Sequence, residues 1–148
     1  MVARCAARAR RRAAQATLVA PRMIVGIGFD LVDIARVEAM LERKEQRALD
    51  RLFTPHEQEY AMSRARPAMH LSARLAAKEA TFKALTGSDE AKLIGWKEAE
   101  VRRGDEGPPV LHFSGRAEAR AKELGVQKVW LTLSHTDDTA GAVVILET

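Results

Sequence analysis

The sequence predicts an α+β fold in which helices pack on a mainly antiparallel β-sheet. Three observations lead to this prediction. Strand patterns occur as hairpins joined by polar turns, the helical patterns are grouped along the chain, and no internal repeat or linker separates them. A chain of 148 residues is also long enough to bury a single hydrophobic core. We therefore expect one domain.

The first two elements are a strand over residues 23–32 and a helix that begins near Asp33. The strand is an apolar run punctuated by glycines, and Asp33 suits the N-cap of the helix that follows. The helical pattern continues over residues 34–49. Its expected buried positions, which recur at helical spacing, are Ile34, Val37, Met40 and Leu41.

Signals at their ends mark two more helices. Thr54, Pro55 and Glu57 have the order of an N-cap, a first helical position and the third position of a capping box. The longest helical pattern covers about residues 67–85 and ends at Gly87. The remaining elements are, in order, a loop over 88–95, a strand over 96–101, a polar turn over 102–109, a strand over 110–113, a helix over 115–124 and a hairpin with strands 129–135 and 140–147.

The basic charge of the chain is concentrated in an N-terminal leader, residues 1–22. The leader holds six of the 24 basic residues and no acidic residue, so the rest of the chain has 18 basic against 20 acidic residues. Such a balance removes the main argument for nucleic-acid binding. We expect the domain to cover residues 23–148 and to have no nucleic-acid partner.

The Ala/Arg-rich leader is open to three interpretations. It is an organellar transit peptide, a basic tail for nucleic acid, or the result of a start codon upstream of the true one at Met23. In each case we expect disorder. The sequence has no apolar run of membrane-spanning length, so we expect no membrane partner. The single cysteine, Cys5, excludes a disulfide framework, and we expect a cytoplasmic location.

The first strand places a carboxylate among apolar residues. Side chains alternate across a strand. One face carries Val25, Ile27, Phe29 and Leu31. The other face carries Gly26, Gly28, Asp30 and Val32. We expect Phe29 and its neighbours to pack the core, and the two glycines to leave space for a ligand beside Asp30. Asp30 then binds a cation or donors, or it caps backbone amides.

A second carboxylate, Glu79, lies in an apolar helical stripe with Leu75 and Phe82. Lys83 is one turn further, so Glu79 is either a functional carboxylate or half of an ordinary surface ion pair. Two carboxylates without a cluster of His and Cys suit Mg²⁺, which takes other ligands from water and substrate phosphates. The pattern indicates phosphoryl or pyrophosphate chemistry, and the usual nucleotide-binding motifs are absent from the sequence.

Ser134 and His135 end a strand at the mouth of the closing hairpin. Adjacent strand residues face opposite sides of a sheet, so the two do not form a nucleophile–base dyad. His135 is either a phosphate or ligand contact or a hydrogen-bonded structural residue.

Six motifs occur along the chain in the order GIGFDLVDIARVE, FTPHE, RLAAKEATFKAL, GWKEAEV, GPPVLHFSGRA and SHTDDTAGAVVILE. Together they resemble the holo-[acyl-carrier-protein] synthases, the short type of 4′-phosphopantetheinyl transferase, over residues 23–147. The resemblance implies the 4′-phosphopantetheinyl transferase fold. It also implies Mg²⁺-dependent transfer of phosphopantetheine from coenzyme A (CoA) to a serine of an acyl carrier protein, with release of adenosine 3′,5′-bisphosphate, in support of fatty acid biosynthesis.

The resemblance also assigns roles to residues that match its motifs. Asp30 and Glu79 would hold Mg²⁺, and Glu79, Lys83 and His135 would be catalytic. The expected CoA contacts are Arg74, Lys83, Ser134 and His135. The attacking serine would belong to the carrier protein, and its proton would pass to a water on the metal or to Glu79. Where the family usually has a G-T-G-like loop that helps to hold CoA, this chain has T-G-S-D-E-A.

The family is homotrimeric with active sites at subunit interfaces. The resemblance therefore implies that the Ser134–His135 end of one chain meets the Asp30–Glu79 region of its neighbour. Carrier proteins of this kind are acidic, and a basic docking stripe would comprise Arg36, Arg43 and Arg47 on the first helix and, a little further, Arg51. Arg36 lies in a matching motif, whereas the other three are alternatively part of a solvated face. Two other functions stay open, a CoA-pyrophosphate hydrolase and a non-catalytic CoA- or carrier-protein-binding module.

Overall fold

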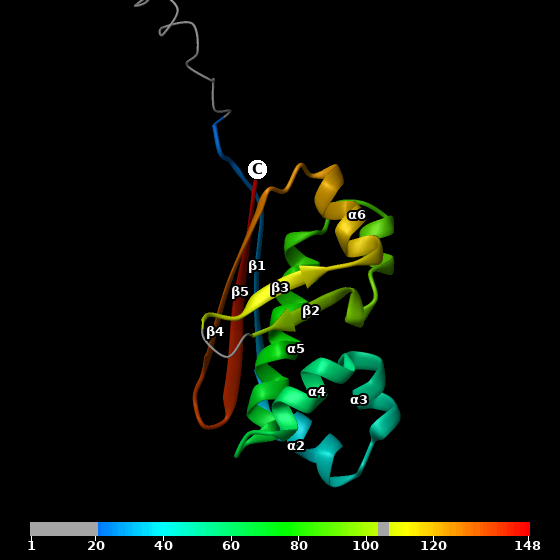
Figure 1. Ribbon diagram of the computed structural model, residues 1–148, viewed down its shortest axis with the longest axis vertical. Helices are drawn as coiled ribbons and strands as arrows, with labels where there is room; N and C mark the ends of the chain where they lie inside the picture. Colours follow the sequence, from blue (N-terminus) through cyan, green and yellow to red (C-terminus); the bar gives the residue numbers. More distant parts are fainter. Residues whose placement is uncertain (1–20, 104–106) are drawn as a thin grey trace, which may run out of the picture.

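The structure is a computed structural model that describes residues 21–103 and 107–148 (Figure 1). Apart from its last two residues, the predicted leader lies outside this part of the chain. The elements are β1 (Ile24–Asp33), α2 (Ile34–Glu42), α3 (Gln46–Leu52), α4 (Pro55–Met62), α5 (Pro67–Ala84), η1 (Glu90–Leu93), η2 (Trp96–Glu98), β2 (Ala99–Arg102), β3 (Val110–Phe113), α6 (Gly115–Glu123), β4 (Lys128–His135) and β5 (Thr139–Glu147).

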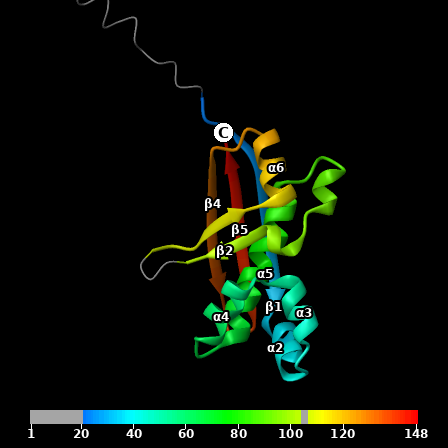
Figure 2. The same ribbon diagram turned by 45° about the vertical axis from the view of Figure 1, so that its right-hand side comes forward.

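The predicted α+β fold with antiparallel sheets is confirmed. A three-stranded sheet has the order β1-β5-β4, and β2 pairs with β3 in a separate two-stranded sheet. The long helix α5 packs along β1 and β5, while the β2–β3 hairpin crosses α5 and also contacts β4 (Figures 1 and 2). Within the described residues, no helix has both the length and the apolar character needed to cross a membrane.

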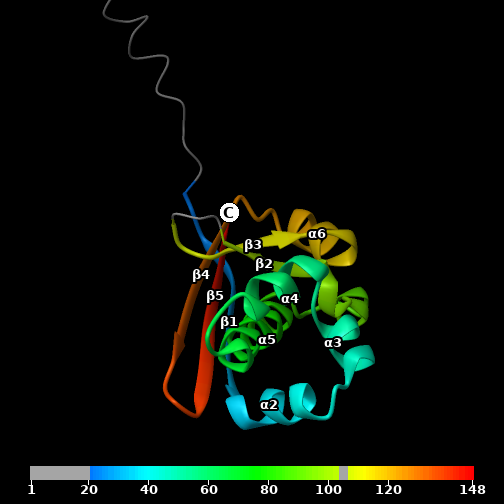
Figure 3. The same ribbon diagram turned by 60° about the horizontal axis from the view of Figure 1, so that its bottom comes forward.

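The two faces of β1 have the opposite roles to those predicted. Ile27, Phe29 and Leu31 are 60%, 54% and 59% exposed, so they do not pack the core. The helices lie on the other side of the sheet, as Figure 3 shows. Gly26 and Gly28 face α5, where an added Cβ would lie 2.3 Å from the carbonyl oxygen of Ala84 and 1.7 Å from that of Ala80. The glycines therefore let a helix approach the strand, and the expected ligand space beside them is filled by α5.

The predicted helix over residues 34–49 is interrupted. Helix α2 ends at Glu42, and Lys44 has a φ of 52° before α3 begins at Gln46. The amide of Glu45 bonds to Met40 O and that of Lys44 bonds to Leu41 O, which is the pattern of a Schellman motif. The chain uses lysine where glycine is usual, so no residue type marks the break.

The predicted helix starts are largely correct. Asp33 occupies the N-cap position of α2, although its side chain makes no capping hydrogen bond. Thr54 and Glu57 form the predicted capping box at the start of α4. The strand predicted over 96–101 is shorter, because residues 96–98 form the 3₁₀ turn η2.

Candidate active site

Asp30 and Lys83 form the closest charged contact of the candidate site. Lys83 Nζ donates to Asp30 Oδ1 at 2.7 Å and to the carbonyl oxygen of Phe29 at 2.9 Å. Asp30 lies on the helix-facing side of β1, and its side chain is 18% exposed. In the described part of the chain, no backbone amide donates to this carboxylate, so the capping alternative for Asp30 is wrong.

Glu79 lies on α5, one turn before Lys83, and is half-buried. Burial is the main cause that raises the pKa of Glu79, and the nearby Asp30 carboxylate raises it further. Lys83 and Arg36 act against this rise. Since Lys83 is bonded to Asp30 and forms no ion pair with Glu79, the ordinary Glu79–Lys83 surface pair does not form. Ionisation of Glu79 is therefore less favourable in this chain than ionisation of an ordinary exposed glutamate.

A groove with a volume of about 400 Å³ opens beside these charges. Its lining residues are Glu79, Phe82, Lys83, Thr86, Ala91, Lys92 and Ile94. The T-G-S-D-E-A loop contributes to its rim, and Asp89 there is paired with Lys92 at 2.8 Å. The groove combines an apolar wall, two lysines and a carboxylate, which is a suitable lining for a ligand with both phosphate and apolar parts.

Arg74 and His135 lie in a different groove, which is formed by α4, α5 and β4 together with Arg103, Pro108 and Pro109. It also holds His70 and Tyr60. Arg74 is 3% exposed and its guanidinium lies 4.2 Å from the centre of the Tyr60 ring. Its Nε has no hydrogen-bond partner among the described residues. Burial, then the charge of Arg74, lowers the pKa of His70. A buried guanidinium with an unused donor is suited to binding an anion.

The two candidate regions are separate within one chain. Asp30 lies on β1 and His135 on β4, which are the two edge strands of the large sheet, and the two grooves share no lining residue. Ser134 and His135 face opposite sides of β4, as predicted. Ser134 is in register with Gly141 and with the outward-facing Leu31, whereas His135 is in register with Ala140 and the buried Val32. Both residues border a hollow at the end of the hairpin, and His135 Nδ1 lies 3.2 Å from Thr136 O.

The predicted basic stripe does not lie on one helix. The break at Lys44 assigns Arg36 to α2 and Arg47 to α3, so the spacing that suggested a common face no longer applies. Each of the predicted arginines is exposed, and Arg43 lies 3.7 Å from Glu45.

Sequence reasoning missed three residues that the structure connects with the candidate regions. His70 precedes Arg74 by one helical turn, a spacing that could have suggested a shared face. Glu57 and Lys78 form a buried ion pair, and no spacing signal could have indicated it because they are 21 positions apart in the sequence.

The residues present fit a divalent cation only in part. The described residues contain no group of three or more His, Cys, Asp or Glu side chains arranged to hold a metal. Asp30 and Glu79 nevertheless bring two carboxylates close enough to repel each other. A hard cation that keeps water and substrate oxygens as further ligands needs no more protein ligands than these.

Comparison with known proteins gives a consistent result. Residues 26–144 match the sequence profile of the 4′-phosphopantetheinyl transferase superfamily. The chain is 41% and 46% identical, over 125 residues, to holo-[acyl-carrier-protein] synthases of Geobacter metallireducens and Trichlorobacter lovleyi; each match spans 84% of this chain and 98% of the relative. It resembles a crystal structure of the Bacillus anthracis holo-(acyl-carrier-protein) synthase in complex with CoA (3′,5′-ADP), with a TM-score of 0.66, 34% identity and coverage of 85% and 98% of the two chains.

Proposed function

The chain belongs to the 4′-phosphopantetheinyl transferase superfamily, and from its similarity to holo-[acyl-carrier-protein] synthases we infer that it is one of them. It transfers the 4′-phosphopantetheine group of CoA to a serine of an apo-acyl carrier protein and releases adenosine 3′,5′-bisphosphate. The observation that carries this proposal is the match, over nearly their whole length, to synthases 41–46% identical. The cytoplasmic location and the role in fatty acid biosynthesis stay predictions.

Asp30 and Glu79 are the proposed ligands of Mg²⁺. Their mutual repulsion supports the assignment, because a cation between them would stabilise both ionised carboxylates. Mg²⁺ bound there would neutralise charge that develops on the pyrophosphate of CoA.

The side chains around this pair supply binding and proton transfer. Lys83 would contact a phosphate of CoA, and its exposed ammonium group is already aimed at this region by its bonds to Asp30 and Phe29. The serine oxygen of the carrier protein forms a bond to the phosphorus next to the pantetheine, and the bond from that phosphorus to the bridging pyrophosphate oxygen breaks. We propose that the Glu79 carboxylate accepts the serine proton.

A homotrimer with interfacial active sites would unite the two grooves. The outer face of the large sheet exposes Ile27, Phe29 and Leu31. An apolar patch of this kind favours association with another chain. We propose that Arg74, Ser134 and His135 of one chain approach the Asp30–Glu79 region of its neighbour and contact CoA there. Carrier-protein docking is assigned to Arg36, Arg43 and Arg47, which are exposed and basic.

One assay separates this proposal from the hydrolase and the binding module. Apo-carrier protein, CoA and Mg²⁺ are incubated with the enzyme, and the intact carrier and the nucleotide products are both measured by mass spectrometry. Transfer gives a carrier that is heavier by one phosphopantetheine and an equal amount of adenosine 3′,5′-bisphosphate. Nucleotide release with an unmodified carrier would indicate a hydrolase, and no reaction would leave only binding.

A further inference from the structure

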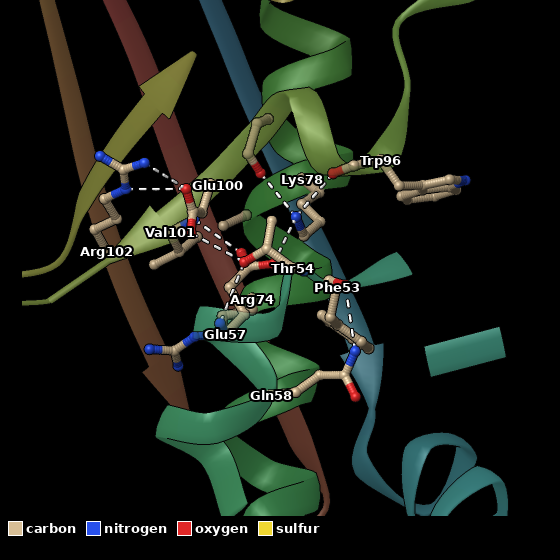
Figure 4. Close-up of polar contacts among 12 residues, drawn as sticks. Phe53, Thr54, Glu57, Gln58, Arg74, Lys78, Trp96, Glu100, Val101 and Arg102 are labelled. Carbon is tan, nitrogen blue, oxygen red and sulfur yellow. Dashed lines mark hydrogen bonds and ion pairs between the residues drawn. The ribbon is translucent and has the colours of Figure 1, made fainter. Parts of the chain in front are cut away.

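Glu57 and Lys78 form an ion pair in the interior of the protein (Figure 4). Both side chains are 0% exposed, and Lys78 Nζ lies 2.9 Å from Glu57 Oε2. The two residues come from different motifs, Glu57 from FTPHE at the start of α4 and Lys78 from RLAAKEATFKAL in α5. Neither residue has a part in the reaction proposed above.

Every polar atom of the pair has a partner. Lys78 Nζ donates to the carbonyl oxygens of Trp96 and Ala99, each at 2.8 Å, in addition to its contact with Glu57. Glu57 Oε1 accepts from the amide of Val101 at 2.8 Å. Its Oε2 also accepts from the amide of Thr54 at 2.9 Å. The ion pair thus joins α4 and α5 to the segment 96–101, as Figure 4 shows.

These contacts fasten a segment that forms one wall of the groove beside Glu79. Among the described residues, the only hydrogen bonds between α5 and residues 90–99 are the two that Lys78 donates. Ile94 lines the groove. Trp96 packs edge-on against Phe82, a second lining residue, with 5.0 Å between ring centres. Lys78 therefore supplies the hydrogen bonds that join this wall to α5, although it does not itself line the groove.

We propose that Lys78 and Glu57 are positioning residues that fix the 94–99 wall and so determine the affinity of the groove for CoA. This inference rests on the proposed function, because it takes CoA as the ligand of that groove. A buried ion pair contributes little to stability compared with uncharged residues of similar volume, whereas removing one partner leaves a buried charge and is strongly destabilising. What the pair supplies is a fixed arrangement of three segments.

The double variant Glu57→Gln/Lys78→Met tests the proposal, because it removes both charges and leaves the interior filled. We expect the KM for CoA to rise about tenfold, because the groups of the 94–99 wall that bind CoA would be displaced. The kcat and the KM for the carrier protein should change little. Amide hydrogen exchange of a peptide covering residues 94–99 should become faster, because the carbonyl contacts to α5 are lost. The exchange measurement requires no enzymatic activity.

Leu71→Val is the matched control. Leu71 is 0% exposed and lies about two turns before Lys78 on α5, so its truncation lowers Tm without affecting the wall. It should leave the KM for CoA and the exchange of residues 94–99 unchanged. If the wild-type chain does not transfer phosphopantetheine to the carrier protein, the proposed function is wrong. With an active chain, an unchanged KM for CoA or unchanged exchange in the double variant would overturn the positioning role.

Discussion

At the scale of single residues, the candidate site contains two carboxylates, and only one of them has a neutralising partner among the described residues. Lys83 neutralises Asp30 through a 2.7 Å contact. Glu79 has no hydrogen-bond or ion-pair partner among the described residues, and burial together with Asp30 raises its pKa. The free energy of unfolding should therefore be lower when Glu79 is ionised. A carboxylate whose ionised form destabilises the folded chain is typical of a binding or catalytic site.

Replacing Glu79 with glutamine should raise stability and remove activity. The folded-state pKa of Glu79 is above its unfolded value, so its favourable contribution is present at low pH and is lost as pH rises through the raised pKa. Glu79→Gln should thus raise the Tm of the metal-free protein at pH 8 but hardly at pH 4, and lower kcat at least about 100-fold. Glu90→Gln, a change at an exposed site, is the control. A Glu79→Gln variant with full turnover would refute the assigned role.

The stabilising effect of Mg²⁺ should depend on pH. Carboxylates bind metal in the ionised form, so protonation of Glu79 competes with the cation, and this competition begins at a higher pH than for an ordinary glutamate. Thermal unfolding with and without MgCl₂ should show a clear increase in Tm at pH 8 and a smaller one at pH 5. Equal shifts at the two values, or an equal shift in Asp30→Asn, would argue against this metal site.

At the scale of helices and strands, the predicted and observed elements agree where local signals mark the ends of an element. End signals located α4, α5 and α6 because their caps and stops are local. The helix break at Lys44 was not predicted, because lysine gives no signal for a left-handed conformation. The faces of β1 were reversed because bare glycines are equally compatible with a nearby ligand and a nearby helix. Only tertiary structure distinguishes those two cases.

Gly28→Ala should destabilise the protein through the contact between β1 and α5. The new Cβ would lie 1.7 Å from the carbonyl oxygen of Ala80, which is backbone and cannot rotate away. We expect a loss of about 3 kcal/mol in the free energy of unfolding, at the upper end of overpacking effects. Gly95→Ala is the control, since its nearest contact would be an ordinary 3.7 Å. Similar stability of both variants in urea titrations would show that α5 does not press on β1.

At the scale of the whole molecule, two features favour association with another chain. Helices cover one side of the large sheet (Figure 3). On the other side, Ile27, Phe29 and Leu31 of β1 are exposed. The groove with Glu79 and the groove with Arg74 lie in different places on the chain. Self-association would cover the apolar face and bring the two grooves together. The sequence could suggest this arrangement only through the family that it resembles.

Phe29→Arg should dissociate the proposed trimer. Phe29 is 54% exposed on the outer face of β1, so a charge there costs little in a monomer but would be buried at an interface. Analytical ultracentrifugation should show a shift from trimer to monomer with an unchanged circular dichroism spectrum. Met62→Arg, at an exposed apolar residue on α4, should have no such effect. A wild-type chain that sediments as a monomer would contradict the assembly.

The most direct test of the account is a subunit-mixing experiment with variants that are each inactive. Glu79→Gln and His135→Ala chains are co-expressed with different tags, co-purified and assayed for transfer to apo-carrier protein. If the site is shared between chains, activity returns to about a quarter of the wild-type level, because one interface in four combines two intact halves. Glu79→Gln mixed with Asp30→Asn, which alters the same half, should stay inactive. Activity no higher than that of the separate variants would contradict the shared site.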